Sequence, residues 1–307
     1  MAKPILKWAG GKRQILEDLY TYFPKRYNKY HEPMIGGGAL FFDLEPKRGG
    51  TINDINPRLM NFYKTVRDEP EQLIEISKSF KSPETAPDPS KEFSELNRKC
   101  KKVKNYYYQQ RELFNRRPSG EKFDPIHEAA LLLYLNRTCY NGLYRENSSG
   151  EFNVPIGRYK NPDWVRETEI IQASKVLKHV NIFNKPFDYI LEFVEPRDLV
   201  YFDPPYVPMS PTANFTDYNA QGFDKKHQKR LLEIAKNLNN KDINIIISNS
   251  GVMYNYYKKE GFEVNFVNAT RAINSDPEKR GEIAEIIATN ISPPQRRGLQ
   301  QKSLKDF

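Results

Sequence analysis

Cysteine and histidine are scarce in this chain of 307 residues. Its two cysteines, Cys100 and Cys139, and its four histidines have no spacing that would bring metal ligands together, so we expect no metal site. So few cysteines also exclude a disulfide scaffold and favour a reduced, cytoplasmic protein.

Long apolar runs are missing as well. The opening MAKPILKWAGGK has no apolar core of the length that a signal peptide needs, and no run reaches the roughly 18 residues of a membrane span. The mean hydropathy is only -0.76, yet 38% hydrophobic and 13% aromatic residues indicate a folded chain. We therefore expect no contact with membranes.

Acidic residues are outnumbered by basic ones, and the net charge is +9. Much of the excess lies between Arg98 and Lys122, a stretch that contains nine lysines or arginines, only two acidic residues and several tyrosines. A basic block interleaved with aromatic residues favours a polyanionic partner, although basic character also serves solubility.

The most informative stretch is an apolar segment, 199–202, that ends in Asp203, Pro204, Pro205 and Tyr206. The segment is typical of a buried strand, and the two prolines hold the chain extended and remove two N–H donors. In open α/β sheets, ligands bind outside the carboxyl ends of the strands. We expect acceptor oxygens to face a ligand here.

Two acceptors beside an aromatic face suit an exocyclic amino group on a flat heterocycle. Asp203 and the Pro204 carbonyl would accept its two hydrogens while Tyr206 stacks on the ring, which makes the nitrogen lone pair available as a nucleophile. The alternative is a proline-rich turn with a capping aspartate.

Two glycine-rich segments precede this stretch. In Lys7-Trp8-Ala9-Gly10-Gly11-Lys12, a glycine pair opens into a predicted helix and suits an anionic group, with Lys12 adding charge. A predicted strand, 31–35, then runs into Gly36, Gly37 and Gly38, where the backbone can lie against a nucleotide-like ligand. The alternatives are an ordinary loop and a common turn.

A second predicted strand near Thr51 and Ile52 ends in Asn53-Asp54-Ile55-Asn56-Pro57. An acidic side chain this far beyond a glycine turn is placed to bind ribose hydroxyls. The alternative is that Asp54 or Asn56 caps the helix that begins near Pro57.

The alternation of strands and helices lapses between residues 59 and 178. We interpret this region as an inserted, mainly helical module with an apolar helix at 129–135. Turn signals in 141–150 and alternation in 151–154 predict a hairpin, whose tip carries groups suited to base edges.

Alternation then resumes, which predicts an α/β fold. We expect strands at 180–183, 243–248, 262–267 and 283–289, a helix at 225–238, a lid loop at 207–222 and a turn at 274–280.

In this order the motifs resemble the Dam-type, D12 class DNA adenine-N6 methyltransferases, which transfer a methyl group from S-adenosylmethionine to adenine N6 in duplex DNA. The motifs are KWAGGK, EP-x-x-GGGALFF, NDIN, NGLYR, GEFNVPIGRYK, DPPY and RAIN. The resemblance implies a Rossmann-like class I methyltransferase sheet over 1–58 and 179–292. It further implies a target-recognition domain over 59–178 with a β-hairpin, and a polar tail, 293–307.

The resemblance also implies the roles of single residues. Those that bind the methyl donor are Trp8, Lys12, Gly36, Gly37, Gly38, Asp54 and Asp203. Those that contact DNA are Lys7, Tyr140, Asn141, Leu143, Arg145, Pro155 and Tyr159. Met34 departs from the family, which usually has an aromatic residue at that position.

The implied target is the adenine of GATC. Lys7 and Arg145 would read guanines, Leu143 and Pro155 would touch thymine methyl groups, and Tyr140 or Asn141 would support the disturbed stack. Base flipping and direct in-line transfer would yield S-adenosylhomocysteine, without a metal or a covalent enzyme intermediate.

Other readings stay open at this stage. The amino group of another DNA target, of RNA or of a protein amide is an alternative substrate, and a catalytically silent DNA-binding regulator is an alternative function. A nicotinamide dehydrogenase has the wrong glycine spacing. We expect a monomer that acts on DNA in a prokaryotic or phage-infected cell, with a cognate restriction endonuclease as a further partner.

Overall fold

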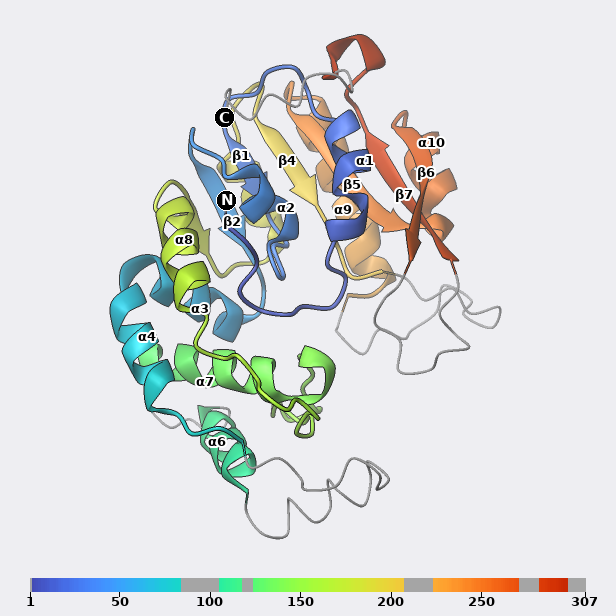
Figure 1. Ribbon diagram of the computed structural model, residues 1–307. Helices are drawn as coiled ribbons and strands as arrows, with labels where there is room; N and C mark the ends of the chain where they lie inside the picture. Colours follow the sequence, from blue (N-terminus) through green and yellow to red (C-terminus); the bar gives the residue numbers. More distant parts are fainter. Residues whose placement is uncertain (1, 84–104, 118–123, 207–222, 271–281, 298–307) are drawn as a thin grey trace. The chain divides into compact units, whose positions relative to one another are not determined.

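The computed structural model describes residues 2–83, 105–117, 124–206, 223–270 and 282–297 (Figure 1). The chain forms two compact units. The helical unit comprises 1–11, 36–43 and 56–178, and the sheet unit comprises 12–35, 44–55 and 179–307. Residues 1–11 and 36–43 thus group with the helices, whereas the functional domain boundaries given above remain a prediction.

A seven-stranded sheet lies entirely within the sheet unit, in the order β3-β2-β1-β4-β5-β7-β6. Its strands are β1 (Tyr30–Glu32), β2 (Gly50–Asn53), β3 (Asn181–Phe183), β4 (Leu199–Phe202), β5 (Asn244–Ser250), β6 (Glu263–Thr270) and β7 (Glu282–Thr289). Neighbours from β3 to β5 are parallel, and β7 is antiparallel to both β5 and β6. This order confirms the predicted Rossmann-like fold, with its topological switch point between β1 and β4.

The strands follow the predicted apolar runs closely. All four residues of β4 are buried, and Val200 pairs with Ile245 of β5. Several boundaries differ: β6 ends at Thr270 and not at residue 267, and β1 ends at Glu32 and not at Ile35. Pro33 explains the early end, since it has no N–H to offer a neighbouring strand.

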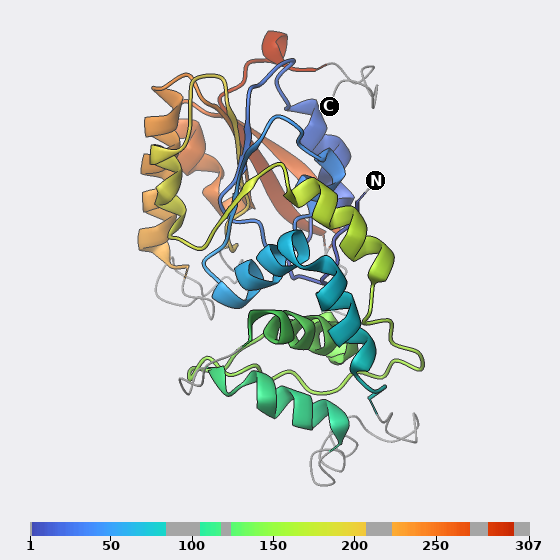
Figure 2. The same cartoon turned by 90° about the vertical axis from the view of Figure 1, so that its left-hand side faces the viewer.

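The sheet unit also contains the helices η1 (Arg13–Ile15), α1 (Leu16–Thr21), η4 (Phe187–Glu192), α9 (Lys225–Asn239), η5 (Gly251–Met253), α10 (Tyr254–Lys259) and η7 (Pro293–Gln295). Figures 1 and 2 show α1 and α9 on opposite faces of the sheet.

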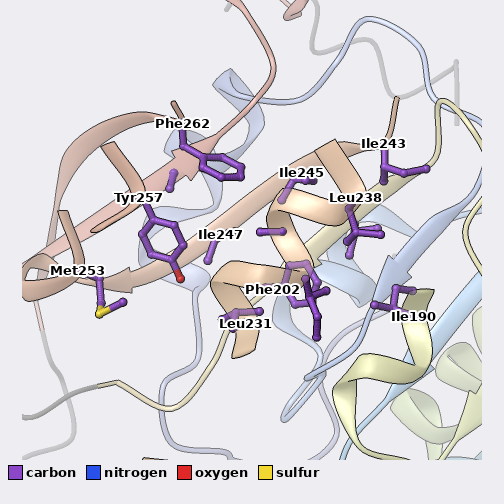
Figure 3. Packing of buried hydrophobic residues seen from close by; sticks show 14 of the residues in the cluster. Ile190, Phe202, Leu231, Leu238, Ile243, Ile245, Ile247, Met253, Tyr257 and Phe262 are labelled. Carbon is purple, nitrogen blue, oxygen red and sulfur yellow. The ribbon is translucent and has the colours of Figure 1, made fainter. Parts of the chain in front are cut away.

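The face under α9 holds the main apolar cluster of the sheet unit (Figure 3). Leu231 and Leu238 recur at helical spacing and pack with Phe202 and Ile247, and each is fully buried. Each such side chain stabilises the fold by about 1.5–3 kcal/mol. The packing fixes the end of β4, from which Asp203 projects.

The helical unit is built around one apolar helix. Its helices are α3 (Pro57–Asp68), α4 (Pro70–Ser79), α6 (Tyr106–Phe114), α7 (Pro125–Thr138), η3 (Tyr140–Gly142) and α8 (Glu167–Leu177), and α2 (Ala39–Leu44) begins in it. Residues 129–135 of α7 are buried on every side, because α3, α4 and α6 all pack on this helix. Of the two predicted caps of α3, the structure shows Asn56, whose side chain accepts hydrogen bonds from two backbone N–H groups at the start of the helix.

The predicted hairpin is present, but pairing is sparse. Within the described stretch 124–206, residues 139–156 pair only through the bridges Cys139–Ile156 and Glu146–Phe152. Asn147 closes the turn, its side-chain oxygen accepting from the N–H groups of Ser149 and Glu151.

Several predicted features lie outside the described residues. They are the lid loop 207–222, the turn 274–280 with RAIN, and the basic block except for 105–117. The start of the tail is held in place: the Arg297 N–H donates to the Phe23 carbonyl, and Arg296 pairs with Glu263. No helix among the described residues has the length and apolarity to cross a membrane.

Candidate active site

Asp203 follows β4 at the switch point of the sheet. β1 is the neighbouring parallel strand, so its last residue, Glu32, lies at the same edge. The Pro205 carbonyl is held by α9, because it accepts a hydrogen bond from Gln228 Nε2 at 3.2 Å. The fold therefore presents the DPPY segment where open α/β sheets bind ligands.

Lys12 brings charge to this segment. Its Nζ lies 3.0 Å from Asp203 Oδ1 and 4.4 Å from the centre of the Tyr206 ring, and its side chain is only 5% exposed. The structure thus unites three residues that were predicted from motifs far apart in the sequence.

Two carboxyl groups at the switch point have different protonation states. Burial raises the pKa of Asp203 to about 6, and the Lys12 ammonium opposes this shift. Burial also raises the pKa of Glu32 to about 8, against a hydrogen bond of 2.7 Å from the Tyr30 hydroxyl. At neutral pH, Asp203 is therefore ionised and Glu32 is neutral.

Tyr206 keeps its proton. Burial raises the pKa of its hydroxyl well above the ordinary value, and the nearby carboxylates of Asp203 and Glu285 raise it further. A neutral aromatic ring beside an ionised carboxylate is the arrangement expected for orienting a flat, amino-bearing base.

Sequence reasoning missed Glu32 as part of this site. The available signal was its position in the EP-x-x-GGGALFF motif, where a carboxyl group ends a buried strand. The neighbouring departure, Met34, lies partly buried against the main apolar cluster, so it serves as packing.

Asp54 follows β2, which lies on the other side of β1. Asn184 Nδ2 donates to the Asp54 carbonyl at 2.8 Å, and the Asn53 side chain donates to the Pro33 and Lys185 carbonyls. These bonds fix the end of the strand. Ile55, which sequence reasoning passed over, is 69% exposed and forms an apolar surface at the same edge.

In the helical unit, Trp8 packs against the glycine turn. A Cβ atom on Gly37 would lie 2.9 Å from Trp8 Cβ, and one on Gly36 would lie 3.0 Å from Trp8 Cδ1. Gly36 and Gly38 also have positive φ, which suits glycine. The turn therefore depends on glycine for both backbone shape and contact with the indole.

Lys7 lies among the predicted DNA contacts of the same unit. Its Nζ is 3.1 Å from the Tyr159 hydroxyl and lies over that ring. The Tyr140 N–H donates to the Pro155 carbonyl at 2.8 Å, which joins the two sides of the hairpin. The four predicted residues thus form two pairs within the helical unit.

The remaining hairpin residues differ in exposure. Asn141, with φ of +54°, and Arg145 are exposed, whereas Leu143 is half-buried. The Arg145 Nε donates to Asn153 Oδ1 at 2.7 Å. Burial raises the pKa of the Cys139 thiol to about 12, so this cysteine is no nucleophile at neutral pH.

A residue missed by sequence reasoning, Asn136, organises this region. Its fully buried amide accepts from the Lys7 N–H and donates to the Lys7 carbonyl, each at 2.8 Å. It also donates to the Gly142 carbonyl at 3.1 Å. No local pattern signals this role, because the partners lie far apart in the chain.

Comparison with known proteins agrees with the site. Residues 8–273 match the family described as D12 class N6 adenine-specific DNA methyltransferase. The chain is 38% identical over 290 residues to a type II methyltransferase, M1.LlaDCHI, of Lactococcus lactis subsp. cremoris, covering 94% of this chain and 95% of the relative.

Two further relatives cover most of both chains. The type II methyltransferase M.MjaIII of Methanocaldococcus jannaschii is 40% identical, with 94% of this chain and 99% of the relative covered. The DNA adenine methylase of Escherichia coli K12 is 34% identical, with 93% and 94% covered. The chain is therefore an enzyme of the D12 class of N6 adenine-specific DNA methyltransferases.

Proposed function

We propose that this enzyme methylates the adenine of GATC in double-stranded DNA, after flipping that base out of the helix. The observation that carries the proposal is the cluster of Lys12, Asp203 and Tyr206 at the switch point. An adenine inside the duplex cannot present N6 to such a cluster, and flipping it costs a few kcal/mol.

The residues of the DPPY segment orient the amine. Asp203 and the Pro204 carbonyl accept the two N6 hydrogens, and Tyr206 stacks on the ring. As N6 bonds to the methyl carbon and the bond from that carbon to sulfur breaks, N6 becomes positively charged until it loses a proton. The ionised Asp203 stabilises this charge, and positioning supplies the rest.

S-adenosylmethionine supplies the methyl group on a positively charged sulfur. The chemistry of the sheet edge suits this donor: Asp54 and Asp203 are acidic, Lys12 matches a carboxylate, and exposed Ile55 offers an apolar surface. We assign Trp8 and the glycines 36–38 as further donor contacts on the resemblance to the family. The reaction needs no metal.

The hairpin supplies recognition in this proposal. Lys7 and Arg145 read guanines as charged donors, and Leu143 and Pro155 contact thymine methyl groups. Tyr140 or Asn141 supports the stack beside the flipped base, and Tyr159 holds Lys7. The exposure of Arg145 and Asn141 supports this assignment.

The setting is also part of the proposal. Relatives named type II methyltransferases support a role beside a cognate restriction endonuclease. We further propose that the enzyme acts in the cytoplasm as a monomer, since a single transfer to one adenine needs one active site.

Methyl transfer from labelled S-adenosylmethionine to two duplexes tests the proposal. The duplexes differ only in carrying one GATC or one GTTC. We expect label on the GATC duplex alone, and none with Asp203→Ala. Equal label on both duplexes would overturn the GATC assignment and leave the family activity. Label on neither, with DNA binding intact, would favour the silent regulator or a substrate other than DNA.

A further inference from the structure

Tyr144 of the NGLYR motif has no role in the function proposed above, yet it stacks on Trp8. The two ring centres are 4.9 Å apart and the ring planes are 22° from parallel. The glycine turn, Gly36 and Gly37, presses on the same indole. The place of Trp8 therefore depends on both the glycine turn and the hairpin.

The hydroxyl end of Tyr144 is also held. It donates a hydrogen bond to the Glu146 carboxylate, and the side chain of Asn56 bonds to it. Glu146 Oε1 in turn lies 3.9 Å from Nη1 of Arg58, which is buried. Both Asn56 and Arg58 belong to the start of α3, so Tyr144 connects the hairpin to that helix.

The neighbours of Tyr144 in the chain are the residues assigned to base contacts. Leu143 and Arg145 flank it directly, and the Arg145 carbonyl accepts the Asn153 N–H at 3.0 Å. The three residues share one backbone segment held by this pairing, so a shift of Leu143 and Arg145 would also shift the Tyr144 ring that stacks on Trp8.

We propose that Tyr144 is a positioning residue that couples DNA recognition by the hairpin to methyl-donor binding at Trp8. The inference rests on the proposed function, in which these two regions bind DNA and donor. Coupling of this kind is reciprocal: a duplex that tightens donor binding is itself bound more tightly when the donor is present.

The test measures the dissociation constant of S-adenosylhomocysteine by calorimetry, with and without saturating GATC duplex. For the wild type we expect the duplex to change this constant by about fivefold or more. Tyr144→Leu keeps apolar volume but removes the stack, and we expect the ratio to fall to near one. Tyr144→Phe keeps the stack and should retain most of the ratio.

Tyr254→Ala is the matched control. Tyr254 stacks on Phe266 with the same 4.9 Å between ring centres, but in the sheet unit, so its loss should leave the ratio unchanged. A wild-type ratio of one, or an unchanged ratio in Tyr144→Leu, overturns the coupling. An equal ratio with the GTTC duplex supports the coupling and overturns only the GATC assignment.

The fluorescence emission of Trp8 gives a second measurement of the coupling, one that a loss of stability alone would not reproduce. The chain has two tryptophans, so Trp164→Phe leaves Trp8 as the only indole. We expect the GATC duplex to change the Trp8 emission in this background, and the change to vanish when Tyr144→Leu is added. A change that persists in the double variant overturns the proposal.

Discussion

The switch point of the sheet unit and the hairpin of the helical unit differ in how they expose their charged and polar side chains. At the switch point of the sheet unit, Glu32 is 2% exposed, and the pKa values of Glu32 and Asp203 are both raised by burial. In the hairpin of the helical unit, Arg145 and Asn141 are exposed to solvent. Substituting a buried ionisable group changes the stability of the folded unit, because that group has been removed from water. Substituting an exposed group mainly affects its direct contacts.

The two regions therefore serve different parts of the proposed reaction. Burial in the sheet unit sets the protonation states that the proposed chemistry requires, and exposure in the hairpin leaves donors available for base edges. Substitutions in the first region should therefore change rate or stability steeply, and those in the second should change discrimination. Four predictions test this contrast, from the largest effect to the smallest.

Asp203→Ala should have the largest effect. It removes the acceptor for N6 and leaves the Lys12 ammonium without its 3.0 Å ion pair. We expect kcat to fall about 10³-fold while DNA affinity changes little. Single-turnover methyl transfer measures the first quantity, and a gel-shift titration measures the second. Asp203→Asn, which keeps the shape, is the control. A rate near that of the wild type would contradict the assigned role.

Glu32→Gln should change how stability depends on pH. The folded-state pKa of about 8 lies above the ordinary glutamate value of 4.5, so folding favours the protonated form. Wild-type stability should fall as the pH rises from 4.5 through 8, by up to roughly 4 kcal/mol, and the glutamine variant should lack this loss. Urea unfolding at pH 5 and pH 9 measures the effect. Parallel pH profiles for the two proteins would show that Glu32 is ionised when folded.

Arg145→Ala should relax specificity and spare the chemistry. Loss of one bidentate contact to guanine costs about 1–3 kcal/mol of discrimination. We expect kcat/KM to drop on GATC and to change little on duplexes altered at the guanine. Competition between such duplexes gives the ratio. Arg116→Ala, at an exposed arginine with no assigned base contact, is the control. Equal losses on all duplexes would reassign Arg145 to phosphate contact.

Gly142→Ala should have the smallest effect, a loss of about 1–2 kcal/mol of stability. Gly142 has φ of +66°, and an added Cβ would lie 2.2 Å from Lys7 Cδ. Gly261→Ala is a matched control, because Gly261 has φ of +86° and nothing within 4 Å. Thermal unfolding of both variants separates backbone strain from contact with Lys7. Equal losses would mean that Lys7 moves aside without cost.

Local patterns predicted much of the fold and part of the site. The apolar run of β4 and the two prolines that follow it predict the end of a strand, and the structure places Asp203 directly after that end. The protonation of Glu32 was not predictable, because it depends on burial at the end of β1 and on the carboxylate of Asp203, which is distant in sequence. The same holds for Asn136, whose partner Lys7 is 129 positions away. Sequence periodicity reports single elements, and these effects arise only when elements meet.

Asn136 has a practical consequence for protein engineering. The buried amide of Asn136 hydrogen-bonds to both backbone groups of Lys7 and to the Gly142 carbonyl in η3. The hairpin therefore cannot be transferred to another protein without the segment that holds it. A chimaera that acquires residues 136–159 from this enzyme should fold with its own register only if the segment around Lys7 is transplanted with them.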